Sequence, residues 1–323
     1  MSLNTSDNST LIRDQRYSAE IKEVLDVALQ LDSHVRWVTD ADFGDGNTLN
    51  IPTVGQLTTR DYAEGQQITL EDPTTGSFTL TISKYKQAGI SIPDKFKKDS
   101  WWVNQATMIY KDEIMRALLR QKESDIATLQ ASQTASNPNT VNGVNHRWVS
   151  LGTSNVGSLK DFRKARLAMN KANVPGGGRM AFLDPSFTYE LSETANIVGQ
   201  DVYGPNKIIA DGMTGPTAME AVADSRIFFS RLMGFDAYES NVLDTSLAET
   251  IVATGKEAGS KTSTSAYGNL FVGKDAFIGA IRTEPDMIEY YDGGTRSTVI
   301  HATFRYGLKL YRPESLVVVL TDE

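Results

Sequence analysis

The sequence predicts a mixed α+β fold in which strand-forming and helix-forming stretches occupy different parts of the chain. Between residues 47 and 92, apolar residues alternate with polar ones, as expected of half-buried strands. The stretch from Asp99 to about Gln133 then follows a helical pattern that no Gly or Pro interrupts. Near its end the chain has an apolar, β-branched run from Leu316 to Leu320, which is typical of a strand buried on both faces.

The first 46 residues are predicted to form an N-terminal arm. Residues 1–13 are polar and rich in Ser, Asn and Thr, whereas Glu20–Leu31 has the apolar spacing of a short amphipathic helix. Three Asp residues within Asp40–Gly46 hint at a calcium loop. However, Ile51 stands where such a loop needs a bidentate Glu, so a solvated turn is favoured and no metal site is predicted.

Residues 47–95 are predicted to form an extended β-hairpin loop. Its second strand alternates apolar residues with Thr up to Ile82, its first strand is placed around Thr69, and the turn signal Asp72–Gly76 lies between them. The residues expected to form its contact surface with another subunit are Ile68, Leu70, Asp72, Pro73, Gly76, Phe78, Leu80 and Ile82.

An isolated hairpin of this length has an energetic problem. Ordering a backbone costs about 1–2 kcal/mol per residue, and a two-stranded ribbon alone is marginal in water. Its apolar face must therefore lie on the body of its own chain or on a neighbouring chain. We favour a neighbouring chain, because the sequence shows no obvious helix that would cover the hairpin.

The long helix candidate carries an apolar stripe along one side. Met108, Met115, Leu119 and Ile126 recur at helical spacing and are the predicted packing residues. A polar side is expected to include Lys111, Asp112, Arg116, Gln121, Lys122 and Glu123. At a rise of about 1.5 Å per residue, the helix would be roughly 50 Å long.

The remainder of the chain alternates between short helices and strands. Ser158 is a good N-cap for a helix that ends near Asn173, and the following Gly176–Gly178 is a helix stop rather than a phosphate loop, because it precedes a strand. The other predicted elements are a loop at Ala135–Asn145, a strand at Met180–Leu183, a helix at Ser186–Ile197, a strand at Phe228–Val242 broken at Gly234, a loop at Ile251–Ser265, a helix-turn or strand at Leu270–Arg282, and strands at Met287–Tyr291, Thr298–Tyr311 and Leu316–Leu320.

The composition excludes several functional classes. A net charge of −8 argues against a protein whose main task is to grip nucleic acid. The chain contains no Cys, so thiolate metal sites and disulfides are excluded, and no apolar run reaches the roughly 20 residues of a membrane span. The N-terminus lacks the apolar core of a signal peptide.

Catalytic motifs are missing from the sequence. Only His34, His146 and His301 are available for imidazole chemistry, and His301 falls within an alternating strand pattern. Neither the Gly-x-Ser-x-Gly elbow of α/β-hydrolases nor the His-Glu-x-x-His motif of zinc peptidases occurs. The sequence therefore predicts no enzyme, no catalytic residue and no cofactor, and its arm, unsupported hairpin and overlong helix indicate a protein that assembles.

Two segments carry a resemblance to a known family. The run Arg231–Asn241, with its Gly-Phe-x-Ala-x-x-Ser-Asn pattern, resembles a segment of the major capsid proteins of tailed bacteriophages. The ending His301–Glu314 is similar to the closing strands of that family, and the order of elements matches over nearly the whole chain. The same icosahedral shell fold is shared with encapsulins.

The resemblance implies a domain plan and a structural function. The plan consists of an N-terminal arm (1–46), an extended loop (47–95), a peripheral domain with a spine helix (96–180 and 285–323) and an axial domain (181–284). Copies of the chain would form the hexamers and pentamers of an icosahedral head, assembled in the host cytoplasm and enclosing double-stranded DNA without sequence-specific binding. Scaffolding, portal and decoration proteins would be further partners, and no membrane would be involved.

Some members of this family lock the shell with an isopeptide bond from a Lys of the extended loop. Lys84 and Lys86 are candidates by location, but no Asn or Glu partner can be placed, so non-covalent assembly is expected. Three other interpretations stay open: an encapsulin-type compartment with enzyme cargo, another virion component such as a tail or decoration protein, and a soluble enzyme of unrecognised family.

Overall fold

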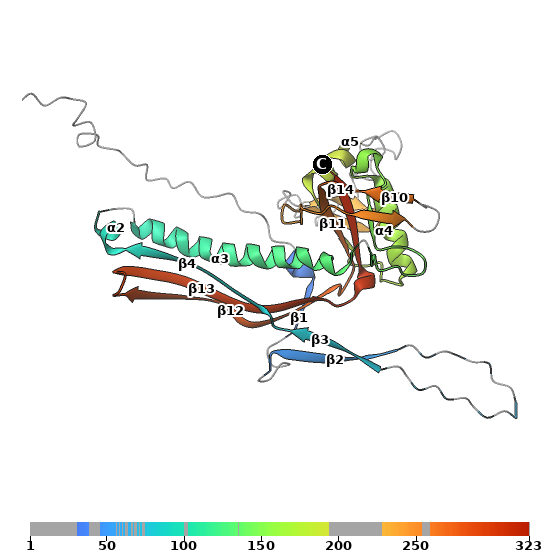
Figure 1. Cartoon of the computed structure of the whole chain (residues 1–323), viewed down its shortest axis with the longest axis horizontal. Coiled ribbons are helices and arrows are strands. Elements are labelled where there is room, and N and C mark those ends of the chain that lie inside the picture. The colour runs from blue at the N-terminus through green and yellow to red at the C-terminus, as the bar shows by residue number, and fades with distance from the viewer. Residues whose placement is uncertain are drawn as a thin grey trace, which may run out of the picture.

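A computed structural model of the chain describes residues 31–38, 46–55, 75–99, 103–134, 136–193, 228–253 and 259–322, with single positions between 57 and 72. These residues form an elongated helix-on-sheet layer, a compact α+β body at one end of it, and a projecting hairpin (Figure 1). The mixed α+β class predicted from the sequence is confirmed. All of the predicted helix Glu20–Leu31 except Leu31, and all of the acidic turn Asp40–Gly46 except Gly46, lie outside the described residues.

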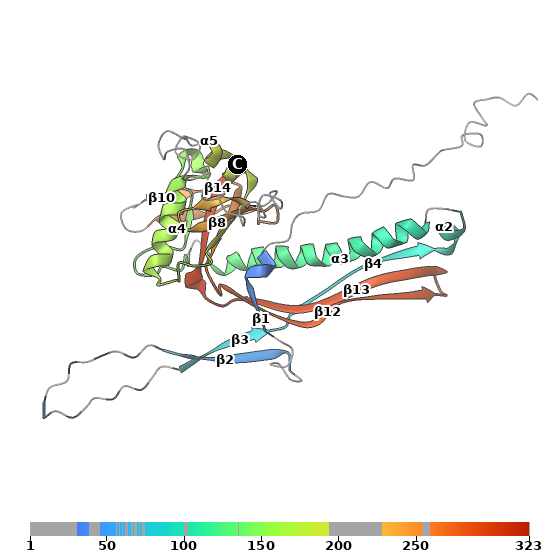
Figure 2. The same ribbon diagram turned by 180° about the vertical axis from the view of Figure 1, so that it is seen from behind.

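The elongated layer is a four-stranded sheet with a long helix laid along one face (Figures 1 and 2). The strand order is β1-β12-β13-β4, in which β1 is parallel to β12 and the other pairs are antiparallel. The elements are β1 (Val35–Val38), β4 (Lys84–Pro93), β12 (Phe277–Asp292), β13 (Ser297–Leu310), the short helix α2 (Asp94–Asp99) and the long helix α3 (Val103–Ala127).

Alternation along β13 explains why α3 lies on this sheet. Ile300, Ala302, Phe304 and Tyr306 are buried in one cluster with Ile114 and Leu118 of α3, so every second residue of the strand faces the helix. Helix α3 has 25 residues, which corresponds to roughly 37 Å, and a 3₁₀ turn, η3 (Thr128–Ser132), continues it. The long predicted helix is therefore present, but it is shorter than the sequence pattern indicated.

The polar side assigned to this helix is wrong at two positions. Lys122 and Glu123 were expected in solvent, yet both side chains are buried. Their partners lie in a 3₁₀ turn, η1 (Leu31–His34), about ninety residues earlier in the sequence. Local periodicity contains no information about such a distant partner.

The hairpin pairs differently from the prediction. Strand β2 (Thr48–Val54) runs antiparallel to β3 (Thr75–Thr81), so Ile51 lies opposite Phe78 and Leu49 opposite Leu80. The expected partner segment around Leu70 is not a strand at the positions described there, so the pairing predicted across a tight turn at Asp72–Gly76 is wrong. We call the described positions between Val54 and Thr75 the outer end of the hairpin.

The compact body contains a six-stranded sheet in the order β5-β14-β11-β6-β8-β7. Its elements are β5 (Arg147–Val149), β6 (Met180–Leu183), β7 (Phe228–Leu232), β8 (Phe235–Glu239), β11 (Ala266–Val272), β14 (Leu316–Asp322), and the helices α4 (Leu159–Lys171) and α5 (Pro185–Glu193). Small 3₁₀ turns, η4 (Thr153–Asn155) and η6 (Pro313–Ser315), and a two-stranded ribbon of β9 (Thr250–Ala253) and β10 (Gly259–Thr262) complete the described part.

The two faces of this sheet are covered by different neighbours. One face, including Phe271 and Val317, packs on Phe162 of α4 and Phe187 of α5. The opposite face, including Val318, packs on Ile126 at the end of α3 and on β1. The end of the long helix is thus part of the core that joins the layer to the body.

Several local predictions are confirmed. Strand β14 lies between two neighbours with its apolar run fully buried. Ser158 caps α4 by accepting a hydrogen bond from the backbone N–H of Lys160. Strands β7 and β8 meet at Met233 and Gly234, both with positive φ, as a two-residue hairpin turn requires. The predicted loop at Ile251–Ser265 is wrong at both ends of its described part, because Ile251–Ala253 and Gly259–Thr262 pair as the β9–β10 ribbon.

Candidate functional site

The base of the hairpin is supported by its own chain. Leu80 and Ile82 are buried against Ile278 and Ala280 of β12, on the face of the sheet that α3 does not cover. Lys309 Nζ donates to the carbonyl oxygen of Thr79 at 2.7 Å. The four-stranded sheet of the same chain therefore covers the apolar side chains at the base of the hairpin. The expectation that a neighbouring chain would cover the hairpin is wrong for this base.

The outer end of the hairpin is exposed. Val54, Leu57 and Leu70 are 75%, 64% and 88% exposed, although each is an aliphatic side chain. Asp72 is also exposed, whereas Ile68 and Pro73 lie outside the described residues. Clustered exposed aliphatic residues on a projecting segment are typical of a surface that another chain covers. The contact role predicted for these residues stays a prediction.

The predicted packing residues of the long helix take different positions. Ile126 is fully buried in the core shared with the compact body, and Met115 packs at the edge of the cluster under α3. Leu119 is half-buried, and nothing is described for the side chain of Met108. Ile114 and Leu118, which the sequence interpretation omitted, are the buried helix residues of that cluster. The packing role assigned to the four residues stays a prediction.

A second exposed surface lies on the far half of the four-stranded sheet. The ladder register places Ile288 opposite His301, and His301 opposite Gly89, on the face turned away from α3. Ile288 and Tyr290 are about half exposed there, and the ring of Tyr290 contacts His301 edge-on at 5.7 Å. No local sequence pattern indicates this surface, because it depends on which face of the sheet α3 covers.

A hollow of about 390 Å³ links this surface to the base of the hairpin. The residues that line the hollow come from the beginning of β4, from the two residues before it, and from β12 and β13. They are Ile82, Ser83, Lys84, Tyr85, Thr283, Thr303 and Arg305. Tyr85 is largely exposed, so the hollow is open to solvent.

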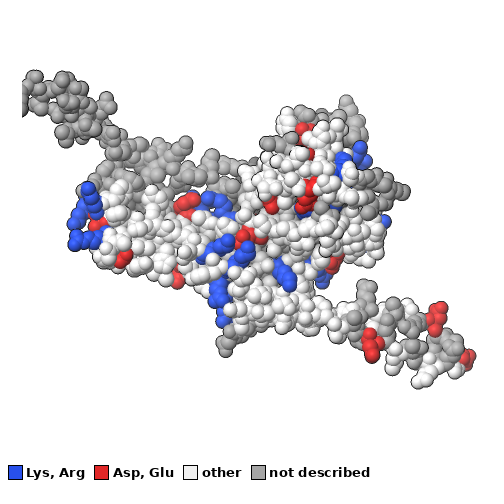
Figure 3. Space-filling model, in the orientation of Figure 1, with Lys and Arg blue, Asp and Glu red and all other residues white. Residues whose placement is uncertain are grey.

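Charged side chains are unevenly distributed over the molecule. Figure 3 shows Lys and Arg side chains gathered at the end of the layer near α2, and Asp and Glu side chains on the outer end of the hairpin. The exposed residues at the first place include Lys95, Lys98 and Arg296, and those at the second include Asp61 and Glu64. The two ends of the molecule therefore present opposite charges.

The candidate cross-linking lysines face their own chain. Lys84 Nζ and Lys86 Nζ lie 3.5 Å and 3.7 Å from the carboxylate of Asp125 in α3. Tyr306 also donates its hydroxyl to Asp125 at 2.7 Å, and burial together with this hydrogen bond raises the pKa of Tyr306. The cluster ties β4 and β13 to the helix.

A second polar cluster fixes the segment that enters the layer from the N-terminus. The carboxylate of Glu123 accepts the backbone N–H groups of Leu31 and Asp32, both at 3.0 Å. Burial raises the pKa of Glu123, whereas these two hydrogen bonds lower it. Lys122 Nζ donates to Asp32 at 2.7 Å and lies 5.3 Å from the ring centre of Trp37. These contacts hold η1 and β1 against α3.

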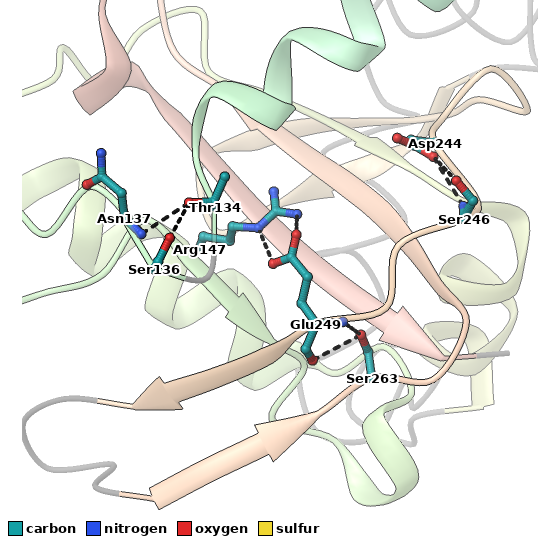
Figure 4. A network of polar contacts seen from close by, with 8 residues as sticks. All are labelled: Thr134, Ser136, Asn137, Arg147, Asp244, Ser246, Glu249 and Ser263. Atoms are coloured by element: carbon teal, nitrogen blue, oxygen red, sulfur yellow. Dashed lines mark hydrogen bonds and ion pairs between the residues drawn. The ribbon is translucent and has the colours of Figure 1, made fainter.

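A third cluster holds the β9–β10 ribbon on the body (Figure 4). Arg147 donates to both carboxylate oxygens of Glu249, from Nε at 2.8 Å and from Nη2 at 2.6 Å. The backbone N–H of Glu249 donates to Ser263 Oγ, and the N–H of Ser263 donates to the carbonyl oxygen of Glu249. The network is structural, because Arg147 is almost completely buried.

The three histidines take separate positions. His146 is fully buried in the body, His34 lies in η1 against the ring of Phe182, and His301 lies on the open face of the sheet. Burial lowers the pKa of both His34 and His146. Among the residues that the structure describes, no three potential metal-binding side chains come together. No described helix is long and apolar enough to cross a membrane.

A long helix laid along a mostly antiparallel sheet, an α+β body at one end and a projecting hairpin are the features of the shell fold of phage capsid proteins. Solved structures with this fold match the whole chain. The cyanophage P-SCSP1u capsid structure matches with a TM-score of 0.71 and 16% identity, over 100% of this chain and 95% of the other. The mature capsid of bacteriophage PhiM1 matches with a TM-score of 0.64 and 12% identity, over 96% and 92%. The capsid of the native GTA particle matches with a TM-score of 0.59 and 12% identity, over the full length of both chains.

Sequence comparison alone does not reach these proteins. No protein-family profile matches the chain, and no curated protein matches it. The identities to the solved capsids are low, so the likeness establishes the fold, and the resemblance inferred from Arg231–Asn241 and His301–Glu314 is confirmed at that level.

Proposed function

We propose that this chain is the major capsid protein of a tailed bacteriophage and builds an icosahedral head. The observation that carries the proposal is the match to the cyanophage capsid structure, which spans the whole chain with a TM-score of 0.71. A structural role is also consistent with clusters of ionisable residues that tie elements together, as at Asp125 and Glu123.

The domain plan expected from the sequence is part of this proposal. Residues 1–46 form an N-terminal arm, 47–95 an extended loop, 96–180 with 285–323 a peripheral domain built on the spine helix α3, and 181–284 an axial domain. Copies assemble into hexamers and pentamers, and the outer end of each hairpin lies on a neighbouring copy. The exposure of Leu57 and Leu70 supports this arrangement, because burying them against a neighbour would contribute about 25 cal/mol per Å² of apolar area.

Assembly is proposed to be non-covalent. Lys84 and Lys86 are ion-paired with Asp125 of the same chain, which disfavours their use in a bond to a neighbouring subunit. Stability of the shell then comes from many contacts of modest strength repeated by symmetry. Double-stranded DNA is enclosed without sequence-specific contacts, and scaffolding, portal and decoration proteins are proposed partners that complete the head in the host cytoplasm.

The test is expression of the full chain with its scaffolding protein, followed by sedimentation and negative-stain electron microscopy. The proposal predicts closed, uniform particles that contain nucleic acid when the packaging machinery is present. A monomer at high concentration would contradict it. Closed particles that carry a protein cargo instead of DNA would identify an encapsulin-type compartment with the same fold.

A further inference from the structure

A second hollow, of about 510 Å³, lies where the elongated layer meets the compact body. Three segments border it: η1 with the start of β1, the turn before β6, and the turn between β11 and β12. The residues with polar or charged groups that matter for its chemistry are His34, Arg36, Gly177, Gly178, Lys274 and Asp275. Its volume lies in the range of about 300–1,000 Å³ that is usual for ligand pockets.

Two exposed cations line this hollow. Arg36 belongs to β1, and Lys274 belongs to the turn between β11 and β12. Within the described part of the chain, neither side chain forms an ion pair. Asp275 is the only carboxylate among the described residues that line the hollow, although the chain as a whole carries a net charge of −8. An anion in the hollow would therefore lie beside two cations and one carboxylate.

Backbone N–H groups add to the positive character of the hollow. Gly177–Gly178 and Lys274–Asp275 are both turns, and the second residue of each has a positive φ, 71° for Gly178 and 57° for Asp275. Among the residues that the structure describes, the N–H groups of these two turns donate to no backbone carbonyl. Successive N–H groups in a turn can form a concavity that binds anions. Both turns are thus potential sources of hydrogen bonds to an anion.

His34 adds a neutral donor rather than a third cation. The centre of its ring lies 5.4 Å from the centre of the ring of Phe182. Burial lowers the pKa of His34, so the imidazole is uncharged at neutral pH. A neutral imidazole still carries one N–H group, which can donate a hydrogen bond to an oxyanion.

We propose that this hollow binds a phosphoryl group, with Arg36 and Lys274 as the cationic contacts and the N–H groups of Gly177 and Gly178 as further donors. Donors from three separate segments can surround a tetrahedral oxyanion, whereas a planar carboxylate is best bound by one bidentate partner. A Cβ atom added at either glycine would meet no atom within 4 Å, so the backbone is open to close approach by a ligand. The site goes beyond the proposed shell function and does not depend on it.

The site differs from the phosphate loop that the sequence excludes at Gly176–Gly178. Such a loop leads into a helix whose N-terminus faces the anion, whereas Gly178 is followed closely by strand β6. In this hollow, the cations of β1 and of the β11–β12 turn take the place of the helix end. Only the fold brings them beside the glycines, because the three segments are far apart in the sequence.

The test is isothermal titration calorimetry of the full chain with inorganic phosphate and with pyrophosphate. Arg36→Gln and Lys274→Gln should each weaken binding about three- to tenfold, and the double variant should weaken it at least about tenfold, because each change removes a charge-assisted hydrogen bond. Both side chains are exposed, so the urea midpoint of each variant should be unchanged. The control Lys160→Gln with Arg163→Gln removes the same two charges from exposed positions of α4 and should bind phosphate normally.

Asp275→Asn tests the sign of the electrostatic effect. Asn has nearly the size of Asp and tolerates the positive φ at this position, but it removes the carboxylate from the hollow. Phosphate should therefore bind about two- to fivefold more tightly to this variant. A purely structural role of Asp275 would not produce such an increase, so unchanged or weaker binding at an unchanged urea midpoint would contradict the proposal.

Two sources of a phosphoryl group are separated by the choice of probe. A short fluorescent DNA duplex is titrated with the same variants and followed by fluorescence anisotropy. Duplex binding that is lost in the Arg36 and Lys274 double variant and is at least about tenfold tighter than phosphate binding would identify the DNA backbone as the source. Phosphate or pyrophosphate binding that is lost in the double variant, with duplex binding unaffected, would identify a free phosphate compound.

Four results would overturn the proposed site. They are no saturable binding of phosphate, pyrophosphate or the duplex, binding that the double variant leaves unchanged, a loss in the α4 control as large as in the double variant, and acetate binding as tight as phosphate binding. None of these results bears on the shell function, which the assembly state of the chain tests separately.

Discussion

Replacement of Glu249 is the most quantitative test of how the compact body is held together. The Arg147 side chain is 1% exposed and Glu249 20%, and both carboxylate oxygens accept hydrogen bonds from the guanidinium. Glu249→Ala removes the carboxylate and leaves a buried cation without its counter-charge. Breaking a buried pair in this way costs about 3–5 kcal/mol of unfolding free energy.

The Arg147–Glu249 ion pair contributes less to the free energy of unfolding than the loss of Glu249 alone would cost. Nη1 of Arg147 has no hydrogen-bond partner among the residues that the structure describes, so within that part of the chain the intact network leaves one buried donor unsatisfied. Replacing both residues, as Arg147→Met with Glu249→Leu, removes the charges and that unsatisfied donor together. We expect this double variant to be at least about 2 kcal/mol more stable than Glu249→Ala, because apolar replacements of buried pairs are often neutral.

The assay is urea unfolding of the unassembled chain, followed by tryptophan fluorescence, since Trp148 neighbours Arg147 in β5. The matched control is Glu289→Ala, which breaks the exposed pair with Lys111, because such pairs contribute about 0–1 kcal/mol. A cost for Glu249→Ala no larger than that of the control would refute the argument. So would a double variant less stable than the single one.

Two further predictions concern the same body. Phe162 is fully buried, and its ring contacts the rings of Phe187, Phe235 and Phe271 edge-on. Phe162→Ala should therefore lower the free energy of unfolding in urea by about 3–5 kcal/mol. A decrease below about 1 kcal/mol would show that the cluster is not close-packed. Burial lowers the pKa of His146, so the unfolded chain binds a proton at this side chain more readily than the folded chain does. The free energy of unfolding is therefore highest above pH 6.5, the ordinary pKa of His, and it decreases as the pH falls below that value. The variant His146→Leu should therefore lose less stability than the original chain between pH 7 and about pH 5, and an unchanged pH dependence would contradict the assignment.

Local sequence signals predicted the elements whose environment is encoded in neighbouring residues. The apolar run of β14, the cap at Ser158 and the turn at Gly234 each depend on a few adjacent positions. The long helix was also evident, although its last turn becomes 3₁₀ at Thr128. These signals were sufficient for the fold class.

Elements determined by distant contacts were not predictable in the same way. Strand β2 lies within the stretch whose alternation predicted strands, but only the structure shows that β3 pairs with β2 rather than with the segment around Thr69. The burial of Lys122 and Glu123 depends on backbone groups at Leu31 and Asp32. Burial of a charged side chain leaves no periodic pattern, because its cause lies elsewhere in the chain.

The candidate contact surfaces also differ in whether neighbouring residues or distant contacts determine them. The hairpin was recognised as a contact surface because its strands lack a covering helix in the sequence, but its base turned out to rest on β12. The open sheet face at Ile288 and Tyr290 exists only because α3 covers the other face of the sheet. The exposed cations Lys95 and Arg296 come together only because the β12–β13 turn meets α2. Their residues are far apart in sequence.

The assembly state of a hairpin-shortened variant tests the central claim most directly. Val54 and Thr75 are the last residue pair of the β2–β3 ladder, so an Asn-Gly turn can replace residues 55–74 and leave the buried base with Leu80 in place. Sedimentation and negative-stain microscopy of this variant beside the full chain are expected to show a folded species of unchanged urea midpoint that forms no closed particles. Closed particles in the same yield as the full chain would contradict the account of a shell subunit joined to its neighbours by the outer end of the hairpin.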